Sequence, residues 1–176
     1  MKSCTPKKLD IYLYGAPVLR DKVQPVERMT DDVRQLIDDM ILTMYEDDGI
    51  GLSANQVGRS VSLFVVGTGA FEEERPDMVF INPEILEMSE ETETMEEGCL
   101  SVPDIREEVT RPTSVRIRFN DPEMKVHVET FTGFPARVIQ HENDHLNGIF
   151  FTDRIRPVRR MLLKRKLAEI ALMQGQ

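Results

Sequence analysis

The chain has 176 residues with ten glycines and ten prolines spread along it, a composition typical of a single globular domain covering residues 1–176. Its net charge of −9 argues against a DNA-binding protein. No signal peptide and no apolar run long enough to cross a bilayer is found, so we expect a cytoplasmic protein without a membrane segment. Its two cysteines, Cys4 and Cys99, fit a reducing compartment and are not expected to form a disulfide.

The first third of the chain is predicted to contain a short strand, a helix and a glycine-rich loop. Ile11–Tyr14 has strand character, and apolar residues between 33 and 44 recur at helical spacing after a capping residue, Thr30. A loop over 49–58 follows the helix. Its Gly49-Ile50-Gly51 lacks the third glycine of a dinucleotide-binding fingerprint, so a phosphate-binding role is not favoured.

The middle of the chain is rich in segments with strand character, several of which alternate polar and apolar residues. The predicted strands cover residues 61–66, 78–81, 85–88, 105–110, 115–119 and 125–131. The polar insert 67–77 is predicted to be a surface loop, and Asn120-Asp121-Pro122 marks a hairpin turn.

The last part of the chain is predicted to contain two helices. The first has Pro135 in its first turn and Gly148 at its C-terminal end, and spans about three turns. A brief strand over 149–151 follows, and Pro157 suits the start of a final helix that reaches about Met173. This order predicts an α+β fold, with antiparallel or mixed sheets around a central helix and further helices near both termini.

The final helix begins in a basic block with no acidic residue inside it. The block contains Arg154, Arg156, Arg159, Arg160, Lys164, Arg165 and Lys166. A solvated helix face is one explanation, and docking onto an anionic partner such as structured RNA is the other.

The strongest indication of chemistry is the motif His141-Glu142-x-x-His145, in the predicted helix between Pro135 and Gly148. Residues four apart share a helix face, so the two imidazoles can bind one metal ion while Glu142 reaches a water molecule beside it. The pattern indicates a hydrolase that uses metal-activated water, although a surface pair of histidines would have the same spacing.

A catalytic metal site usually takes three protein ligands. One large class of peptidases with this motif places the third histidine where this chain has Phe151, which cannot bind a metal, so that class is excluded. Asp153 and Glu169 are weak candidates downstream, and His127 lies on the polar side of a predicted strand. Cys99 is favoured because a thiolate is a strong ligand for Zn²⁺ or Fe²⁺, with a small buried cysteine as the alternative.

Three segments, in this order and spacing, resemble one family, the peptide deformylases. They are the glycine loop Gly49-Ile50-Gly51-Leu52-Ser53-Ala54-Asn55-Gln56, the cysteine motif Glu97-Gly98-Cys99-Leu100-Ser101 and the helix motif Gln140-His141-Glu142-Asn143-Asp144-His145-Leu146. The likeness runs from about Tyr12 to Phe151. Ser53 departs from the alanine usual in the family, and the loop 67–77 looks longer and more acidic than in typical members.

The resemblance implies an enzyme that removes the N-formyl group from the N-terminal formylmethionine of nascent polypeptides and releases formate. It implies that Cys99, His141 and His145 bind one divalent metal ion, commonly Fe²⁺ in the cell, with Zn²⁺, Ni²⁺ or Co²⁺ also accommodated. Glu142 would act as general acid and base toward the metal-bound water. The implied partner is a formylmethionyl peptide, and the basic C-terminal helix, residues 154–176, is a candidate contact with the ribosome.

The family pattern also suggests residues that stabilise the transition state and bind the peptide. It assigns the developing oxyanion to the side-chain amide of Gln56 and the backbone N–H of Leu100, with a structural hydrogen bond as the alternative role for Gln56. Ile50 and Gly51 are expected to bind an extended peptide as an added strand.

The methionine pocket is expected to have Leu100, Val138 and the aliphatic stem of Arg137 in its wall, with the charge of Arg137 in water. Glu97 and Arg106 are expected to pair and hold the metal ligands in place, or else to form an ordinary ion pair.

Two other functions stay open at the level of the sequence. A generic metallopeptidase would cleave internal bonds of unformylated peptides. A non-catalytic, metal-stabilised interaction module would dock through the basic last helix and would not need Glu142.

Overall fold

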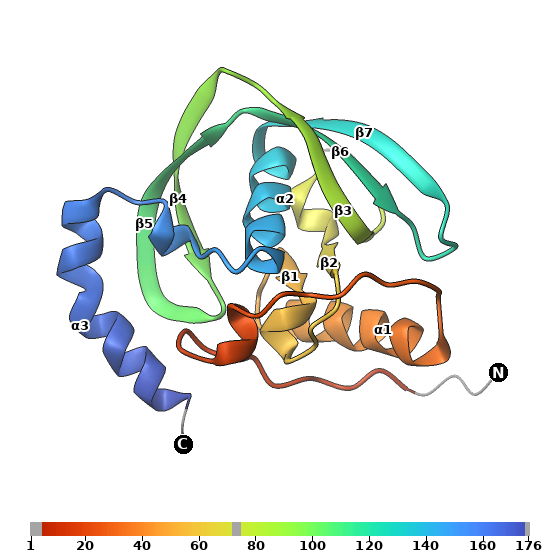
Figure 1. The fold of residues 1–176 in the computed structure, drawn as a ribbon, viewed down its shortest axis with the longest axis horizontal. Coiled ribbons are helices and arrows are strands. Elements are labelled where there is room, and N and C mark those ends of the chain that lie inside the picture. The colour runs from red at the N-terminus through yellow and green to blue at the C-terminus, as the bar shows by residue number, and fades with distance from the viewer. Residues whose placement is uncertain (1–4, 72–74, 175–176) are drawn as a thin grey trace.

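Two antiparallel sheets flank a central helix in the computed structural model, which describes residues 5–71 and 75–174. The helices are α1 (Asp31–Glu46), α2 (Gly133–Leu146) and α3 (Pro157–Met173), and the strands are β1 (Gly51–Ser53), β2 (Leu63–Val66), β3 (Met78–Met88), β4 (Thr92–Cys99), β5 (Val102–Pro112), β6 (Ser114–Asn120) and β7 (Val126–Thr132). One sheet has the order β1-β2-β3-β6-β7, and β4 and β5 form a separate ribbon. Figure 1 shows α2 between this ribbon and the strands β3, β6 and β7, with α3 outside β5. The α+β prediction is confirmed.

The first helix forms as its sequence predicts. The side chain of Thr30 accepts a hydrogen bond of 3.3 Å from the backbone N–H of Val33, which caps α1. Its apolar face is buried, with Met40 and Met44 fully enclosed, and packs with Leu52 and Leu63 in one core cluster. This packing fixes the loop that carries β1 next to the centre of the molecule.

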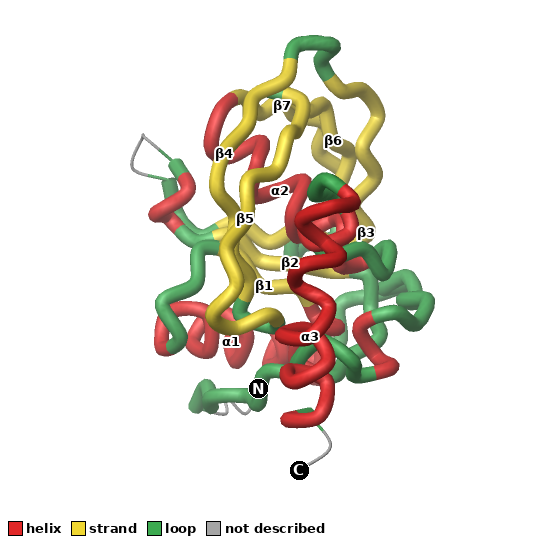
Figure 2. Tube along the Cα trace, turned by 90° about the vertical axis from the view of Figure 1, so that its left-hand side faces the viewer, coloured by secondary structure: helices red, strands yellow, loops and turns green. Residues whose placement is uncertain are grey.

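The central helix α2 is enclosed on nearly all sides, which Figure 2 shows from a second direction. Pro135 lies in its first turn, and Gly148, just past its end, has a left-handed φ of +69°, so both predicted boundary signals are confirmed. The helix is one turn longer than predicted, with 14 residues. Since a polar group buried without a partner is costly, the polar residues of an enclosed helix have to find partners inside the protein.

Two predicted strands are wrong. In Ile11–Tyr14, the N–H of Tyr12 donates to the carbonyl of Gln56 (2.8 Å) and that of Tyr14 to the carbonyl of Ser101 (2.7 Å), so the segment bridges two partners and forms no ladder. In Ile149–Phe151, the chain instead enters a 3-10 turn, and both phenylalanines are only 1% exposed because they anchor a core cluster with α3.

The strand boundaries differ from prediction in the middle of the chain. The segments 78–81 and 85–88 form one strand, β3, in which Pro83 lies at an irregularity in the pairing with β6, where a strand tolerates proline. The predicted segment 105–110 extends to the whole of β5, so Pro103 lies inside a strand. Strand β4 was not predicted, because its mostly exposed sequence Thr92–Cys99 has no clear alternation of polar and apolar residues. The turn at Asn120-Asp121-Pro122 is confirmed.

The final helix α3 starts at Pro157 and ends at Met173, as predicted. Four residues of the basic block are ion-paired, in the pairs Arg154–Asp144, Arg159–Glu107, Arg160–Asp153 and Arg165–Glu169. Arg156, Lys164 and Lys166 are exposed and have no ion pair within the described part of the chain. No helix among the described residues is long and apolar enough to span a bilayer. Cys4 lies outside those residues, and Cys99 is a free thiol.

Candidate metal centre

One sulfur and two ring nitrogens converge where the ribbon meets α2. Cys99 Sγ lies 3.2 Å from His145 Nε2, which lies 3.2 Å from His141 Nε2, and all three atoms are within 4.8 Å of one another. Tetrahedral metal sites with bonds of about 2.0–2.3 Å hold such atoms about 3.3–3.6 Å apart. The three side chains therefore fit a divalent metal ion.

Local structure explains why these residues meet. His141 and His145 lie one helical turn apart on α2, and Cys99 ends β4 where the ribbon turns, paired with Val102 of β5. The other ligand candidates lie elsewhere, because His127 bonds to Asp121 at 2.6 Å and Asp153 bonds to Arg20. Cys99, His141 and His145 are the only cluster of potential ligands among the described residues.

Glu97 orients the first histidine. His141 Nδ1 lies 2.9 Å from the Glu97 carboxylate, which selects the ring form with Nε2 free to face Cys99 and His145. Glu97 also accepts hydrogen bonds from Arg111 at 2.6 and 2.9 Å and from Arg137 at 2.7 Å. Burial alone would raise the pKa of Glu97, but the hydrogen bonds from His141 and Arg111 hold that pKa well below its ordinary value. The carboxylate is therefore ionised at neutral pH.

The support extends one step further, to residues that the sequence did not single out. Arg111, only 2% exposed, donates to Asp144 at 2.7 Å, and Asp144 is in turn bound by Arg154 at 2.5 Å. Asp144 belongs to the quoted helix motif, and its position directly before His145 is the only sequence signal that marked it. A continuous chain of charged groups thus links the segment before α3 to His141.

Two expectations about arginines are wrong. Arg106 is 70% exposed at its side chain and lies 3.9 Å from Glu96, so it does not pair with Glu97. Arg137 is only 5% exposed, and its guanidinium binds Glu97 and the carbonyls of Val109 and Glu93 instead of lying in water. Arg137 is close to Glu97 because α2 packs against the ribbon, a long-range contact that local sequence does not encode.

The second histidine is held by its backbone. Asn55 donates from its side chain to the carbonyl of His145 at 2.6 Å, which ties the glycine loop to α2. Burial lowers the pKa of His145 well below its ordinary value, which favours the neutral form of this ring. Its Nδ1 atom is buried without a hydrogen-bond partner in the described structure.

Glu142 lies beside the three ligands with a free carboxylate oxygen. The residue is 4% exposed, and its Oε2 has no hydrogen-bond partner among the described residues. Burial raises the pKa of Glu142 to about 7. Gly51 packs directly against it, because a Cβ atom on Gly51 would lie 2.7 Å from Glu142 Oε1. The arrangement leaves a carboxyl group able to take up or release a proton near neutral pH.

Gln56 is fixed with its amide nitrogen toward the centre. Its Oε1 accepts hydrogen bonds from the backbone N–H (3.0 Å) and hydroxyl (2.9 Å) of Ser53, and its Nε2 donates to Ser101 Oγ at 3.1 Å and faces Cys99 Sγ at 3.4 Å. Ser53, the departure from the usual alanine, therefore supplies a hydroxyl donor that alanine lacks. Gln56 therefore makes structural hydrogen bonds with its oxygen and, at the same time, points its amide nitrogen toward the metal ligands as a possible donor.

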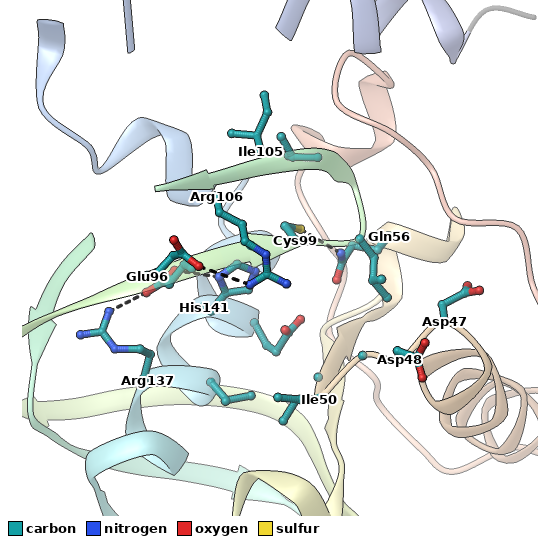
Figure 3. Close-up of a pocket in the computed structure, with 18 of the residues that line it drawn as sticks. Asp47, Asp48, Ile50, Gln56, Glu96, Cys99, Ile105, Arg106, Arg137 and His141 are labelled. Atoms are coloured by element: carbon teal, nitrogen blue, oxygen red, sulfur yellow. Dashed lines mark hydrogen bonds and ion pairs between the residues drawn. The ribbon is translucent and has the colours of Figure 1, made fainter. Parts of the chain in front are cut away.

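The centre opens into a cavity of about 620 Å³, drawn in Figure 3. Its lining contains eleven of the twelve residues assigned to the site from the family resemblance, all except His145: Ile50, Gly51, Gln56, Glu97, Cys99, Leu100, Arg106, Arg137, Val138, His141 and Glu142. A buried acid beside a set of metal ligands at the floor of an open cavity is the arrangement of a metal-dependent hydrolase.

Comparisons with known proteins agree with this description. The family model for polypeptide deformylase matches residues 8–161. The chain is 46% identical over 171 residues to a peptide deformylase of Salinibacter ruber, covering 92% of this chain and 88% of that protein. Among solved structures, peptide deformylase 1B of Arabidopsis thaliana in complex with an inhibitor has a TM-score of 0.87 at 36% identity, with 92% of this chain and 90% of that chain covered. A class I type b enzyme from Acinetobacter baumannii with Met-Ala-Ser bound has a TM-score of 0.80 at 39% identity, with coverage of 84% and 98%.

The chain belongs to the polypeptide deformylase family, which confirms the resemblance inferred from its three motifs.

Proposed function

We propose that this protein removes the N-formyl group from formylmethionine at the start of nascent polypeptides and releases formate. One observation carries the proposal: Cys99, His141 and His145 converge beside Glu142 at the floor of a cavity in a chain of the deformylase family. The bound Met-Ala-Ser of the Acinetobacter baumannii relative supports a peptide that begins with methionine as the molecule that enters this cavity.

Cys99, His141 and His145 are the proposed ligands of one divalent metal ion, Fe²⁺ in the cell, in a site whose sulfur and nitrogen donors also suit Zn²⁺, Ni²⁺ or Co²⁺. When bound, the metal would supply a positive charge that lowers the pKa of a water molecule toward about 7. Glu97 keeps His141 in the ring form that offers Nε2, with Arg111 and Arg137 holding the Glu97 carboxylate in place.

Glu142 is the proposed general base and acid. Its Oε2, which has no partner in the described part of the chain, takes the proton from the attacking water and returns it to the amine that leaves the formyl carbon. A carboxyl group with a pKa of about 7 can perform both transfers at neutral pH. Gln56 Nε2 and the Leu100 N–H are the proposed donors to the oxyanion that forms on the formyl oxygen. The two bonds from Ser53 support this role, because they hold the Gln56 amide in one orientation.

The peptide is proposed to add to β1, an edge strand of the large sheet, with Ile50 and Gly51 as its partners. Leu100 and Val138 are the apolar wall of the methionine pocket, while Arg137 contributes by holding Glu97. Arg106, exposed at the mouth, is placed to contact the peptide beyond the methionine.

The protein is proposed to work in the cytoplasm as a single catalytic domain, residues 1–176. The basic C-terminal helix, residues 154–176, is its proposed contact with the ribosome. Support comes from Arg156, Lys164 and Lys166, which are exposed and free of ion pairs in the described structure.

The proposed function is tested by measuring formate release from formyl-Met-Ala-Ser with protein prepared without oxygen, since a thiolate–Fe²⁺ centre oxidises readily. We expect turnover of this peptide and none of Met-Ala-Ser. Cleavage of internal bonds in the unformylated peptide would favour a generic metallopeptidase. A protein that binds metal and releases no formate would instead be an interaction module.

A further inference from the structure

The final helix α3 exposes apolar side chains on the face that points away from the protein. Its inner face, with Leu163, Leu167 and Ile170, is buried in the core cluster beneath it. Figure 1 shows α3 at the outer edge of the molecule, on the outside of β5. Nevertheless, the four most exposed large apolar side chains among the described residues also lie on α3, with 64–72% exposure: Val158, Met161, Leu162 and Leu172.

These side chains form one continuous surface, which we call the outer stripe. It consists of the four apolar residues just named together with Arg165, Glu169 and the exposed Met173. The positions recur at intervals of three or four residues, so they share the side of the helix opposite the buried face. A helix that is apolar on two opposite faces is normally covered on both, and a contiguous exposed apolar patch marks a site of contact with another molecule.

The outer stripe reads the same from both ends. Met161 and Leu162 near its start and Leu172 and Met173 near its end are equally far from position 167. Arg165 and Glu169 are also placed symmetrically about this position, with opposite charges. They form an ion pair of 3.0 Å along the helix. The stripe therefore has apolar ends, a charged centre and an internal two-fold pattern.

A pattern of this kind is complementary to itself when a second helix runs in the opposite direction. In an antiparallel pair related by a two-fold axis at position 167, the segment 161–162 of one copy meets the segment 172–173 of the other. Arg165 of each copy then lies opposite Glu169 of its partner. The four charges alternate in sign around the axis, so each has an opposite charge on both sides. A parallel pair would instead place each charge opposite an identical one.

We propose that the outer stripe binds the outer stripe of a second copy of this chain, as an antiparallel and two-fold symmetric pair of α3 helices. No residue of α3 lines the active-site cavity, so both cavities stay open in the pair. Lys164 and Lys166 flank Arg165 in the chain and lie on the two sides of the stripe, where the proposed ribosome contact can still use them.

The pair is weak, because its contact is a single helix face. A stable dimer buries about 800 Å² on each partner, and one stripe of five apolar side chains offers less. We expect a dissociation constant on the order of 10 µM, which sedimentation velocity of the full-length, metal-loaded protein measures at concentrations from about 1 to about 500 µM.

The apolar ends are tested by Leu162→Gln combined with Leu172→Gln. We expect this variant to raise the dissociation constant more than about tenfold, since it places polar groups at the centres of both apolar contacts. Val126→Gln combined with Val128→Gln is the matched control, because these exposed apolar residues lie on β7 and not on α3. The control should leave the dissociation constant unchanged. Circular dichroism checks that both variants are folded.

The charged centre is tested by reversal. Arg165→Glu places four negative charges at the axis, and Glu169→Arg places four positive ones, so we expect each to weaken the pair about tenfold. The double variant, Arg165→Glu with Glu169→Arg, restores the alternation and should return the dissociation constant to the wild-type value. Rescue of this kind requires the antiparallel arrangement.

A protein that remains monomeric over the whole concentration range would overturn the proposal, whether or not the stripe proves to bind ribosomes instead. So would a dimer that survives the leucine variant or is lost in the valine variant, because its contact would lie on another face. Charge reversals that leave the dissociation constant unchanged would exclude the antiparallel pair. None of these readouts depends on formate release, so the proposed function is tested separately.

Discussion

The carboxylate of Glu97 binds the guanidinium of Arg111 through two hydrogen bonds of 2.6 and 2.9 Å, and both side chains are almost fully buried. This bidentate pair lies directly behind His141, whose Nδ1 meets the same carboxylate. A buried ion pair is weak support for stability in itself, because desolvation offsets much of the attraction. Here the Glu97–Arg111 pair matters for geometry, because it fixes the ring plane of His141, a proposed metal ligand.

Removal of Arg111 should therefore be costly. Arg111→Gln leaves Glu97 and Asp144 buried without their shared partner, and we expect a loss of about 3–5 kcal/mol in the free energy of unfolding. Urea denaturation measures it. Arg116→Gln, which breaks an exposed pair with Glu87, is the matched control and should cost less than about 1 kcal/mol. Equal losses for the two variants would show that burial of the network is not what matters.

A methyl group at Gly51 should displace the proposed catalytic acid. The added Cβ atom would lie 2.7–2.9 Å from three atoms of the Glu142 side chain, so that side chain has to move. We expect Gly51→Ala to lower kcat for formate release about a hundredfold, because misplacement by about 1 Å has effects of that size. Gly69→Ala, where a Cβ atom would meet nothing within 4 Å, should keep wild-type activity. Wild-type turnover by Gly51→Ala would argue against a role for Glu142 in its present position.

Glu142→Gln separates catalysis from metal binding. The amide has the size of the carboxyl group but cannot accept and return a proton, so we expect kcat to fall by about 10²–10⁴. Metal content, measured by elemental analysis after gel filtration, should equal that of the wild type. A variant that retains full formate release would remove Glu142 from the proposed mechanism.

Cys99→Ser addresses the metal itself. Replacement of the thiolate by a hydroxyl should weaken metal affinity more than about tenfold. Loss of a residue that only supports a metal ligand already costs about tenfold, and loss of a ligand itself should cost more. Competition with a colorimetric chelator measures this affinity independently of activity. His127→Asn is the control, because His127 bonds to Asp121 away from the centre and its loss should leave the affinity unchanged. Unchanged affinity in Cys99→Ser would remove the sulfur from the ligand set.

The pH dependence of stability should report on Asp153. Burial alone raises its pKa, but hydrogen bonds from Arg20 and the Phe150 N–H outweigh burial and lower that pKa below its ordinary value. A carboxyl whose pKa falls on folding stabilises the protein above its unfolded pKa of about 3.9 and loses this contribution as the pH drops through the folded value. The difference in unfolding free energy between wild type and Asp153→Asn should thus be full at pH 6 and shrink below about pH 4. A constant difference down to pH 3 would contradict this assignment.

The sequence predicted the parts of the molecule that depend on local spacing. The boundaries of α1 and α3 follow from Thr30 and Pro157, and the helix motif places His141 and His145 on one face. These signals are local, because caps, turns and helical periodicity act within a few residues.

The rest depends on contacts between distant residues. Glu97 meets Arg111 and Arg137 only because the ribbon folds over α2, and the sequence had suggested Arg106, which is nearer in the chain, as its partner. The segments 11–14 and 149–151 have strand composition, but four of their side chains pack in one core cluster and the segments form no ladder: Leu13, Tyr14, Phe150 and Phe151. Strand β4 escaped prediction because pairing with β5, and not its own pattern, makes it a strand.

The centre draws its groups from Gln56, Cys99 and the pair on α2, so it can close only after most of the chain exists. A growing chain in which α2 has not yet been synthesised has neither of the two imidazoles. It also lacks Arg137 and His141, the partners that α2 supplies to Glu97. Each growing copy therefore lacks two of its three proposed metal ligands, and stays inert, until α2 has been synthesised.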